Sequence, residues 1–320
     1  MKKLLFISLA LFSTVFSSTE EARASLLDRL SGEWISRAIY TANQLEISDF
    51  LMKGPKDIEE LAKLTKTHPD SLKRMMRILT NEGIYIEESG LYRNSEVGAL
   101  LAKEHPDTLH SVTQFYGEEV RKSFDELKNS VETGVPAFNI AYHEPVFVYF
   151  KENLLRAKLF QNVMKEKSAA VIKSVCEKVD FSKYASLADI GGGNGAFLNG
   201  IKQKNSNLKT YLFERPEIIA IANAPNSNLV PGDFFKSINI SSDAYLLKSI
   251  IHDWNDDQAI TILSNIRKAM PEKAEVLIVD IILMPKGEKP YADAMDLLML
   301  TMVGGKERTL DEFKSIAELS

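Results

Sequence analysis

The chain has 320 residues, of which 45% are hydrophobic, and it carries a formal net charge of −5. Such a length allows a substantial core and two domains, and the acidic balance gives no electrostatic basis for nucleic acid as the main partner. The only cysteine, Cys176, excludes intrachain disulfides and clusters of thiolate ligands. The five histidines are scattered along the chain, so we expect no metal site.

The N-terminal segment, residues 1–24, resembles a secretory signal. A basic start precedes an almost entirely apolar run over residues 4–16, and the segment ends in Ala22-Arg23-Ala24. The apolar run is too short to span a membrane as a helix, and the A-x-A ending is typical of a cleavage site. The alternative is a cytoplasmic amphipathic helix, with any membrane contact confined to residues 1–24.

Residues 25–105 are predicted to form a winged helix. Asp57 can cap one helix, with Glu60 in the capping-box position. Pro69 suits the first turn of a second helix, which Gly83 ends. A β-hairpin follows, with strands at 84–86 and 91–93. A winged helix can bind DNA or mediate dimerisation, and the acidic charge favours dimerisation.

The second half of the chain changes rhythm. Residues 106–180 form a helical connecting region with an interruption near Pro136, whereas residues 181–320 alternate between strands and helices. The expected strands lie at 187–190, 211–213, 229–230, 244–247 and 276–279. This order predicts an α/β fold with a Rossmann-like, doubly wound sheet, whose ligands bind at the carboxyl ends of the strands.

A glycine-rich loop follows the first of these strands. Asp189 is the second-to-last residue of the apolar run, and Gly191, Gly192, Gly193 and Gly195 come next. Glycine tolerates positive φ and has no Cβ, so a ligand can approach the backbone closely. The loop also satisfies G-x-G-x-x-A, and the motif alone does not distinguish NAD from S-adenosylmethionine (SAM).

Further polar groups follow the next strands. Glu214 lies a little over 20 residues beyond the glycines, a spacing that places an acid beside a ribose. Asp233 and Phe234 offer an acceptor next to an aromatic face, which suits an adenine. Structural interpretations stay open at this point, because Glu214 could cap a helix and Phe234 could belong to the core.

A histidine lies beyond the fourth strand, on the face where ligands bind. His252 titrates near neutrality, so it can take a proton from a substrate and release it. Asp280, at the end of the fifth strand, and Glu307 could orient its imidazole or accept hydrogen bonds from it.

The ordered motifs resemble those of the SAM-dependent small-molecule O-methyltransferases of the caffeate, hydroxyindole and bacterial polyketide type. The resemblance runs from about Leu26 to the last residue. It rests on Asp-Ile-Gly-Gly-Gly-Asn-Gly, Phe-Glu-Arg-Pro-Glu, Gly-Asp-Phe-Phe, Leu-Lys-Ser-Ile-Ile-His-Asp-Trp-Asn-Asp, Leu-Ile-Val-Asp and Gly-Gly-Lys-Glu-Arg-Thr. An NAD-dependent oxidoreductase and a winged-helix regulator are the less favoured classes, and a catalytically impaired SAM-binding dimer is the alternative within the family.

The resemblance implies a role for each motif. SAM would be held by Asp189, Gly191, Gly193, Glu214, Asp233, Phe234 and Lys248. His252 would be the general base for an aromatic hydroxyl, flanked by Asp280 and Glu307. The acceptor pocket would be lined by Phe115, Phe138, Tyr142, His143, Phe147, Met295, Met299 and Met302. The N-terminal domain would form a homodimer.

Three departures from the family pattern stand out. Asp280 occupies a position that is often glutamate, so its carboxylate reaches one methylene less far. The usual C-terminal hairpin is absent, which predicts that the fifth strand lies at the edge of the sheet with unpaired backbone groups. The signal-like segment conflicts with a cofactor that is kept in the cytoplasm, and on that ground we favour a cytoplasmic location.

Overall fold

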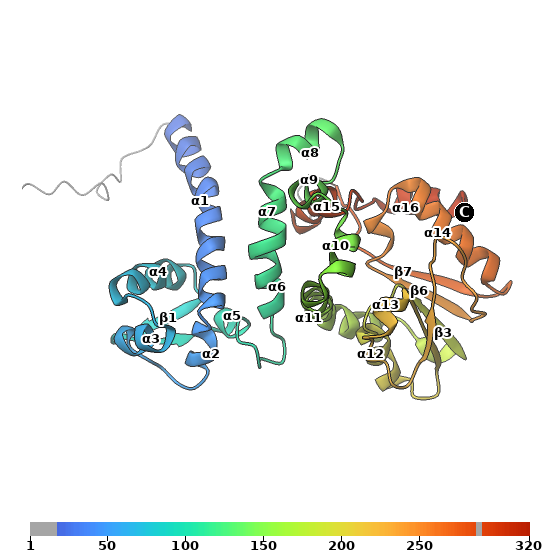
Figure 1. Ribbon diagram of the computed structural model, residues 1–320, viewed down its shortest axis with the longest axis horizontal. Coiled ribbons are helices and arrows are strands. Elements are labelled where there is room, and N and C mark those ends of the chain that lie inside the picture. The colour runs from blue at the N-terminus through green and yellow to red at the C-terminus, as the bar shows by residue number, and fades with distance from the viewer. Residues whose placement is uncertain (1–17, 286–289) are drawn as a thin grey trace, which may run out of the picture. The chain divides into compact units, whose positions relative to one another are not determined.

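The computed structural model describes residues 18–285 and 290–320, and the chain divides into two compact units, Met1–Val97 and Gly98–Ser320 (Figure 1). Most of the signal-like segment therefore lies outside the described residues, and the first helix begins at Ser18. None of the described helices combines the length and the apolar character needed to cross a membrane.

The first unit contains helices followed by a hairpin. Its elements are α1 (Ser18–Gln44), α2 (Ile47–Leu51), α3 (Ile58–Thr65), α4 (Pro69–Asn81), β1 (Tyr85–Glu88) and β2 (Leu91–Asn94). The predicted hairpin is confirmed, with β1 and β2 antiparallel. Asp57 caps α3 by accepting from the Glu60 backbone at 2.8 Å. The predicted capping box is wrong, because the Glu60 carboxylate binds Lys56 instead.

The N-terminal half of α1 presents large apolar side chains to solvent. Leu26, Leu27, Leu30 and Trp34 recur at helical spacing, and Trp34 is 71% exposed. Exposed apolar groups in such a row are typical of a surface that another protein covers.

The helical part of the second unit builds one wall of the site. Its elements are α5 (Glu96–Ala99), α6 (His110–Phe115), the π-helix η1 (Tyr116–Val120), α7 (Arg121–Phe124), α8 (Leu127–Thr133), α9 (Ala137–Tyr142), α10 (Val146–Glu152) and α11 (Leu154–Lys178). Glu166 of α11 accepts hydrogen bonds from the backbone of Ser111 and Val112, at 3.1 and 3.0 Å. Because the first N–H groups of a helix lack partners within it, this contact fixes α6 against α11.

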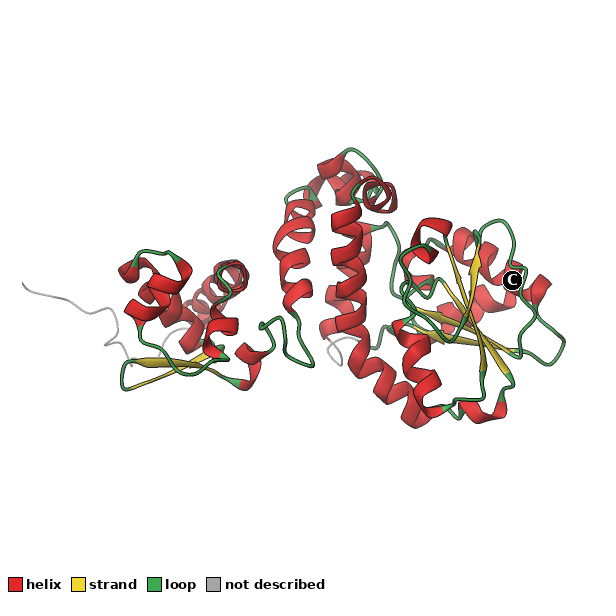
Figure 2. Ribbon diagram, turned by 60° about the horizontal axis from the view of Figure 1, so that its bottom comes forward, coloured by secondary structure: helices red, strands yellow, loops and turns green. Residues whose placement is uncertain are grey.

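The rest of the second unit is the predicted parallel sheet with helices on both faces (Figure 2). Its elements are η2 (Phe181–Lys183), β3 (Ser186–Ile190), α12 (Ala196–Lys204), β4 (Lys209–Glu214), α13 (Pro216–Ile219), β5 (Asn228–Pro231), β6 (Ala244–Lys248), η3 (Ile251–Asp253), α14 (Asp256–Ala269), β7 (Glu275–Val279), α15 (Pro290–Met302) and α16 (Leu310–Glu318). The strand order is β5-β4-β3-β6-β7. All five expected strands are confirmed, each within two residues of its predicted ends.

The sheet is buried on both faces. Ala188 and Ile190 of β3 pack in one hydrophobic cluster with α14 and α16, whereas Leu187 packs in another with α12. Alternate residues of a strand point to opposite faces, so β3 is apolar almost throughout. The strand order reverses between β3 and β6, and ligands of such sheets bind at this point. As expected, β7 has one strand neighbour among the described residues.

Candidate active site

A cavity of about 300 Å³ lies at the carboxyl ends of β3, β4 and β6. We call it the glycine-loop cavity. All seven residues predicted to hold the cofactor line it: Asp189, Gly191, Gly193, Glu214, Asp233, Phe234 and Lys248. The fold thus brings together groups that are up to 59 residues apart in the chain.

The loop after β3 needs its glycines. Gly191 and Gly193 have φ of +73° and +59°, in the left-handed region that side chains disfavour. A Cβ on Gly192 would lie 2.3 Å from Oδ2 of Asp189. The loop backbone therefore packs directly on the carboxylate of β3 and leaves the cavity open above it.

Asp189 is buried at the base of the glycine-loop cavity. Its side chain is 1% exposed, and neither carboxylate oxygen has a hydrogen-bond partner. Burial raises the pKa of Asp189 to about 7, against the opposing charge of Lys248. A buried carboxylate without donors is costly, so this site fits a ligand that brings a cation or hydrogen-bond donors.

Helix α11 closes the glycine-loop cavity with residues that the sequence reasoning missed. Gln161, Met164 and Ser168 recur along one helix face and line the cavity. Ser168 Oγ accepts a hydrogen bond from Lys248 Nζ at 2.7 Å. Burial, with Lys167 nearby, lowers the pKa of Lys248 to about 8. Helical spacing could have signalled this face, but a core-packing face has the same spacing.

A second cavity, of about 290 Å³, lies between the helical wall and the sheet, and we call it the histidine cavity because His252 lines it. Five of the eight residues expected in an acceptor pocket line it: Phe115, Phe147, Met295, Met299 and Met302. Phe138, Tyr142 and His143 do not. Phe138 is fully buried in the helical core, where its ring stacks on Tyr142 at 4.2 Å.

The two cavities share a wall. The residues that line both are Phe147, Phe160, Met164, Lys248, Ser249 and Asp253. Trp254 stands next to this wall, stacked on Phe147 with ring centroids 5.7 Å apart. A ligand in one cavity therefore lies beside a ligand in the other, as a transfer between two molecules requires.

His252 sits in η3 with its imidazole between two carboxylates. Its Nδ1 is 2.8 Å from Oε1 of Glu307, and its Nε2 is 3.6 Å from Oδ1 of Asp253. Burial disfavours the charged ring, but the bond to Glu307 and the charges of Asp253 and Asp280 outweigh it. They raise the pKa of His252 to about 9.

Asp280 supports His252 differently from the expectation. Its Oδ2 accepts from the backbone N–H of His252 at 3.2 Å, and no hydrogen bond joins it to the imidazole. Burial raises the pKa of Asp280. The carboxylate at the end of β7 thus fixes the backbone of η3, and Glu307 alone of the two orients the ring.

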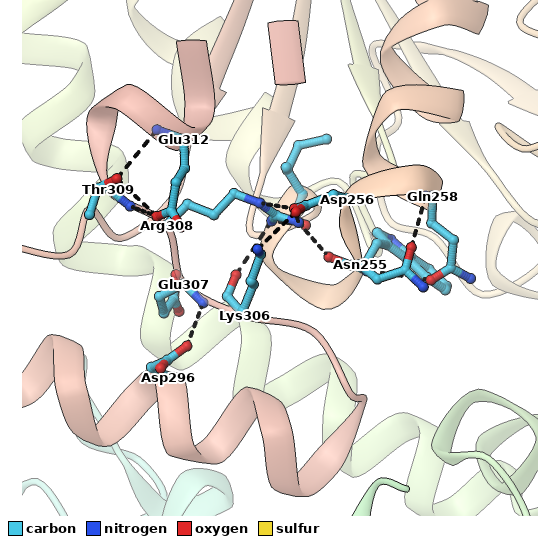
Figure 3. Close-up of polar contacts among 11 residues, drawn as sticks. Asn255, Asp256, Gln258, Asp296, Lys306, Glu307, Arg308, Thr309 and Glu312 are labelled. Atoms are coloured by element: carbon cyan, nitrogen blue, oxygen red, sulfur yellow. Dashed lines mark hydrogen bonds and ion pairs between the residues drawn. The ribbon is translucent and has the colours of Figure 1, made fainter. Parts of the chain in front are cut away.

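The loop over residues 304–309 is anchored on η3 (Figure 3). Lys306 N–H donates to the carbonyl of His252 at 2.9 Å, and a Cβ on Gly305 would lie 2.0 Å from that oxygen. Asp296 of α15 accepts from the backbone of Glu307 at 2.9 Å. The close backbone approach explains Gly305 and carries Glu307 to the imidazole.

Arg308 is a structural anchor that sequence reasoning did not single out. It is fully buried, and its guanidinium donates to Asp256 and to the carbonyls of Ile251 and Trp254. These two carbonyls flank His252 in the chain. Arg308 therefore ties both ends of the histidine turn to the first turn of α14 (Figure 3).

Comparison with known proteins matches the chain to two family profiles. One is described as an O-methyltransferase domain and covers residues 124–320. The other, an O-methyltransferase dimerisation domain, covers residues 27–104.

Similar proteins span nearly the whole chain. Phenazine O-methyltransferase PhzM of Lysobacter antibioticus is 32% identical over 91% of this chain and 88% of its own length. Mitomycin biosynthesis 6-O-methyltransferase of Streptomyces lavendulae is 30% identical over 93% of this chain and 88% of its own. The solved structure of CalO1, a methyltransferase of calicheamicin biosynthesis in its SAH-bound form, has a TM-score of 0.84 and 27% identity over 95% of this chain and 93% of its own.

Proposed function

The chain belongs to the SAM-dependent O-methyltransferase family, and we propose that it transfers the methyl group of SAM to a hydroxyl of a small aromatic metabolite, with His252 as general base. Family membership carries the reaction class. The position of His252 in a cavity that shares a wall with the glycine-loop cavity supports its role. The aromatic acceptor is supported by the apolar lining and by the phenazine in the name of one relative.

The glycine-loop cavity would hold SAM. Gly191 and Gly193 would lie against its methionine part, Glu214 beside its ribose, and Asp233 with Phe234 at its adenine. The buried oxygens of Asp189, which lack partners, support a ligand with positive charge and N–H donors. When bound, SAM supplies a methyl group on a positively charged sulfur.

His252 would take the proton of the acceptor hydroxyl. Glu307 can accept from Nδ1–H, which leaves Nε2 to receive the proton. A phenol has a pKa near 10, and the pKa of His252 is raised to about 9. Because one pKa unit corresponds to about 1.4 kcal/mol, proton transfer between the two groups costs little. Asp280 would act as a positioning residue through the backbone of His252.

A catalytically impaired SAM-binding protein is the alternative. It would keep the glycine-loop cavity without needing a supported base. The hydrogen bond of 2.8 Å between His252 and Glu307, and the anchoring of the Glu307 loop by Arg308, favour an active enzyme. The match to a dimerisation domain and the exposed apolar row on α1 support a homodimer in either case.

The test is methyl transfer from labelled SAM to a panel of phenols, combined with calorimetric titration of SAM. The protein is expected to bind SAM and to methylate at least one phenol. His252→Ala is expected to lower kcat by about 10²–10⁴-fold with unchanged SAM affinity, because the base contacts the acceptor. His105→Ala, which removes an imidazole outside both cavities, is the matched control and should retain activity.

Two results would contradict the proposal. Absence of heat with SAM would remove the cofactor assignment. Full turnover by His252→Ala would remove the base assignment while leaving the reaction class intact.

A further inference from the structure

The histidine cavity contains a cation that the reaction described above does not use. Its lining is mainly aromatic and aliphatic, and the cations among its described lining residues are Lys167 and Lys248. Lys248 lies on the shared wall and is bonded to Ser168. Lys167 comes from α11.

Lys167 is placed beside a hydroxyl group. Its Nζ donates to the hydroxyl of Tyr116 at 3.4 Å and lies 5.9 Å from the centre of the Tyr116 ring. Tyr116 begins the π-helix η1, an irregular turn of the kind that often occurs at functional sites. Burial raises the pKa of Tyr116, so its hydroxyl stays protonated and can donate to a ligand.

Lys167 has no carboxylate partner within the part of the chain that the structure describes. The acids of the histidine cavity are engaged elsewhere: Asp280 binds the backbone of His252, and Asp253 faces its Nε2. An ammonium in an apolar cavity is unfavourable unless an anion pairs with it. The pair of Lys167 and Tyr116 therefore forms an anion-binding position that nothing in the described protein fills.

We propose that the acceptor is an aromatic hydroxy acid, whose carboxylate binds Lys167 Nζ and the Tyr116 hydroxyl while its hydroxyl group reaches His252. This proposal rests on the proposed function and adds the chemical class of the acceptor. A carboxylate on two donors fixes the aromatic ring in orientation, which a wholly apolar pocket does less well. Lys167 is thus a specificity-determining residue.

The test compares 6-hydroxy-2-naphthoate with 6-hydroxy-2-naphthamide, which differ in charge and keep the same ring system and hydroxyl. We expect the acid to have the lower KM. Lys167→Met should raise the KM of the acid about 10- to 100-fold, as loss of a charge-assisted hydrogen bond predicts, and leave the KM of the amide within about twofold. Lys167→Arg should retain the preference for the acid. Lys173→Met, which removes an exposed charge from the same helix, should change neither substrate.

Three results would overturn the proposal. One is equal KM values for acid and amide in the unaltered protein. Another is an equal loss with both substrates in Lys167→Met together with a shifted pH profile, which would mean that Lys167 only offsets the charge of Asp253. The third is failure of Lys167→Arg to retain the preference.

Calorimetry separates this proposal from the proposed function. The naphthoate is titrated into protein saturated with S-adenosylhomocysteine, and Lys167→Met should weaken its binding about 10- to 100-fold. If no phenol is methylated but this weakening is observed, the catalytic assignment fails and the acid site stands. If methyl transfer occurs and binding of the acid does not depend on Lys167, the acid site fails alone.

Discussion

The glycine-loop cavity and the histidine cavity are built from different kinds of sequence. The first is lined by short motifs at strand ends, where a few residues in the chain place a whole group in space. The second is lined largely by side chains from five or more helices, and no motif marks most of them. Within the family, the first cavity serves a shared cofactor and the second serves the acceptor.

The comparison teaches where specificity resides. The backbone of the glycine loop is constrained by contacts that no other residue would tolerate, such as the one between Gly192 and Asp189. The helical wall has no such constraint, and a substitution such as a lysine for an apolar residue at position 167 would change the cavity without changing the fold. Variants in the two cavities should therefore give separable effects.

The largest separation is expected from Asp189→Asn. Loss of the buried charge should weaken SAM binding about 10- to 100-fold, because a hydrogen bond to a charged group contributes about 1.5–3 kcal/mol. Acceptor KM at saturating SAM should change little. Calorimetric titration with SAM and steady-state kinetics measure the two effects. Asp70→Asn, an exposed carboxyl in the first unit, is the control, and an equal loss of acceptor affinity would show that the cavities are not independent.

Next in size is the effect of Glu307→Gln on the pH profile. Since His252 must be neutral to accept a proton and its pKa is raised to about 9, kcat/KM should rise with pH and level off above about 9. Replacing the carboxylate by an amide should move this limb down by about one to two units, because about 1.5–3 kcal/mol corresponds to that shift. An unmoved limb would assign the titration to another group.

A smaller effect is expected from Gly305→Ala. The added Cβ would meet the His252 carbonyl at 2.0 Å, so the loop must shift, at a cost of about 1–3 kcal/mol of stability. Activity should fall with it, because the loop carries Glu307. Urea denaturation and kinetics measure the two losses. Unchanged stability and activity would show that the loop can move away from η3 without consequence.

Gly32→Ala is the matched substitution in the first unit and should have the smallest effect. Gly32 lies inside α1 with nothing within 4 Å of the added Cβ. Alanine in a helix interior stabilises by about 0.5–1 kcal/mol relative to glycine, so the denaturation midpoint should rise slightly while SAM binding and methyl transfer stay the same. A loss of stability here would point to a contact of α1 with another chain.

The sheet was predictable because strands that are buried on both faces are read as short apolar runs with glycines and acids at their ends. All five strands and the hairpin of the first unit were found in this way. The capping box at Asp57 failed because Glu60 has a better partner in the side chain of Lys56, which lies outside the motif. Local patterns do not include such competing partners.

By itself, the sequence determined the family, the sheet and the identity of the residues at the strand ends, because these depend on spacing along the chain. Only the tertiary structure decided that Asp280 supports the backbone of His252, that Arg308 holds the turn around it, and that Phe138 belongs to the core instead of the cavity. It also placed Lys167 beside Tyr116, 51 residues away in the chain. The physical reason is that an apolar or charged helical residue has the same spacing whether it faces a core, a cavity or water, and packing alone selects among them.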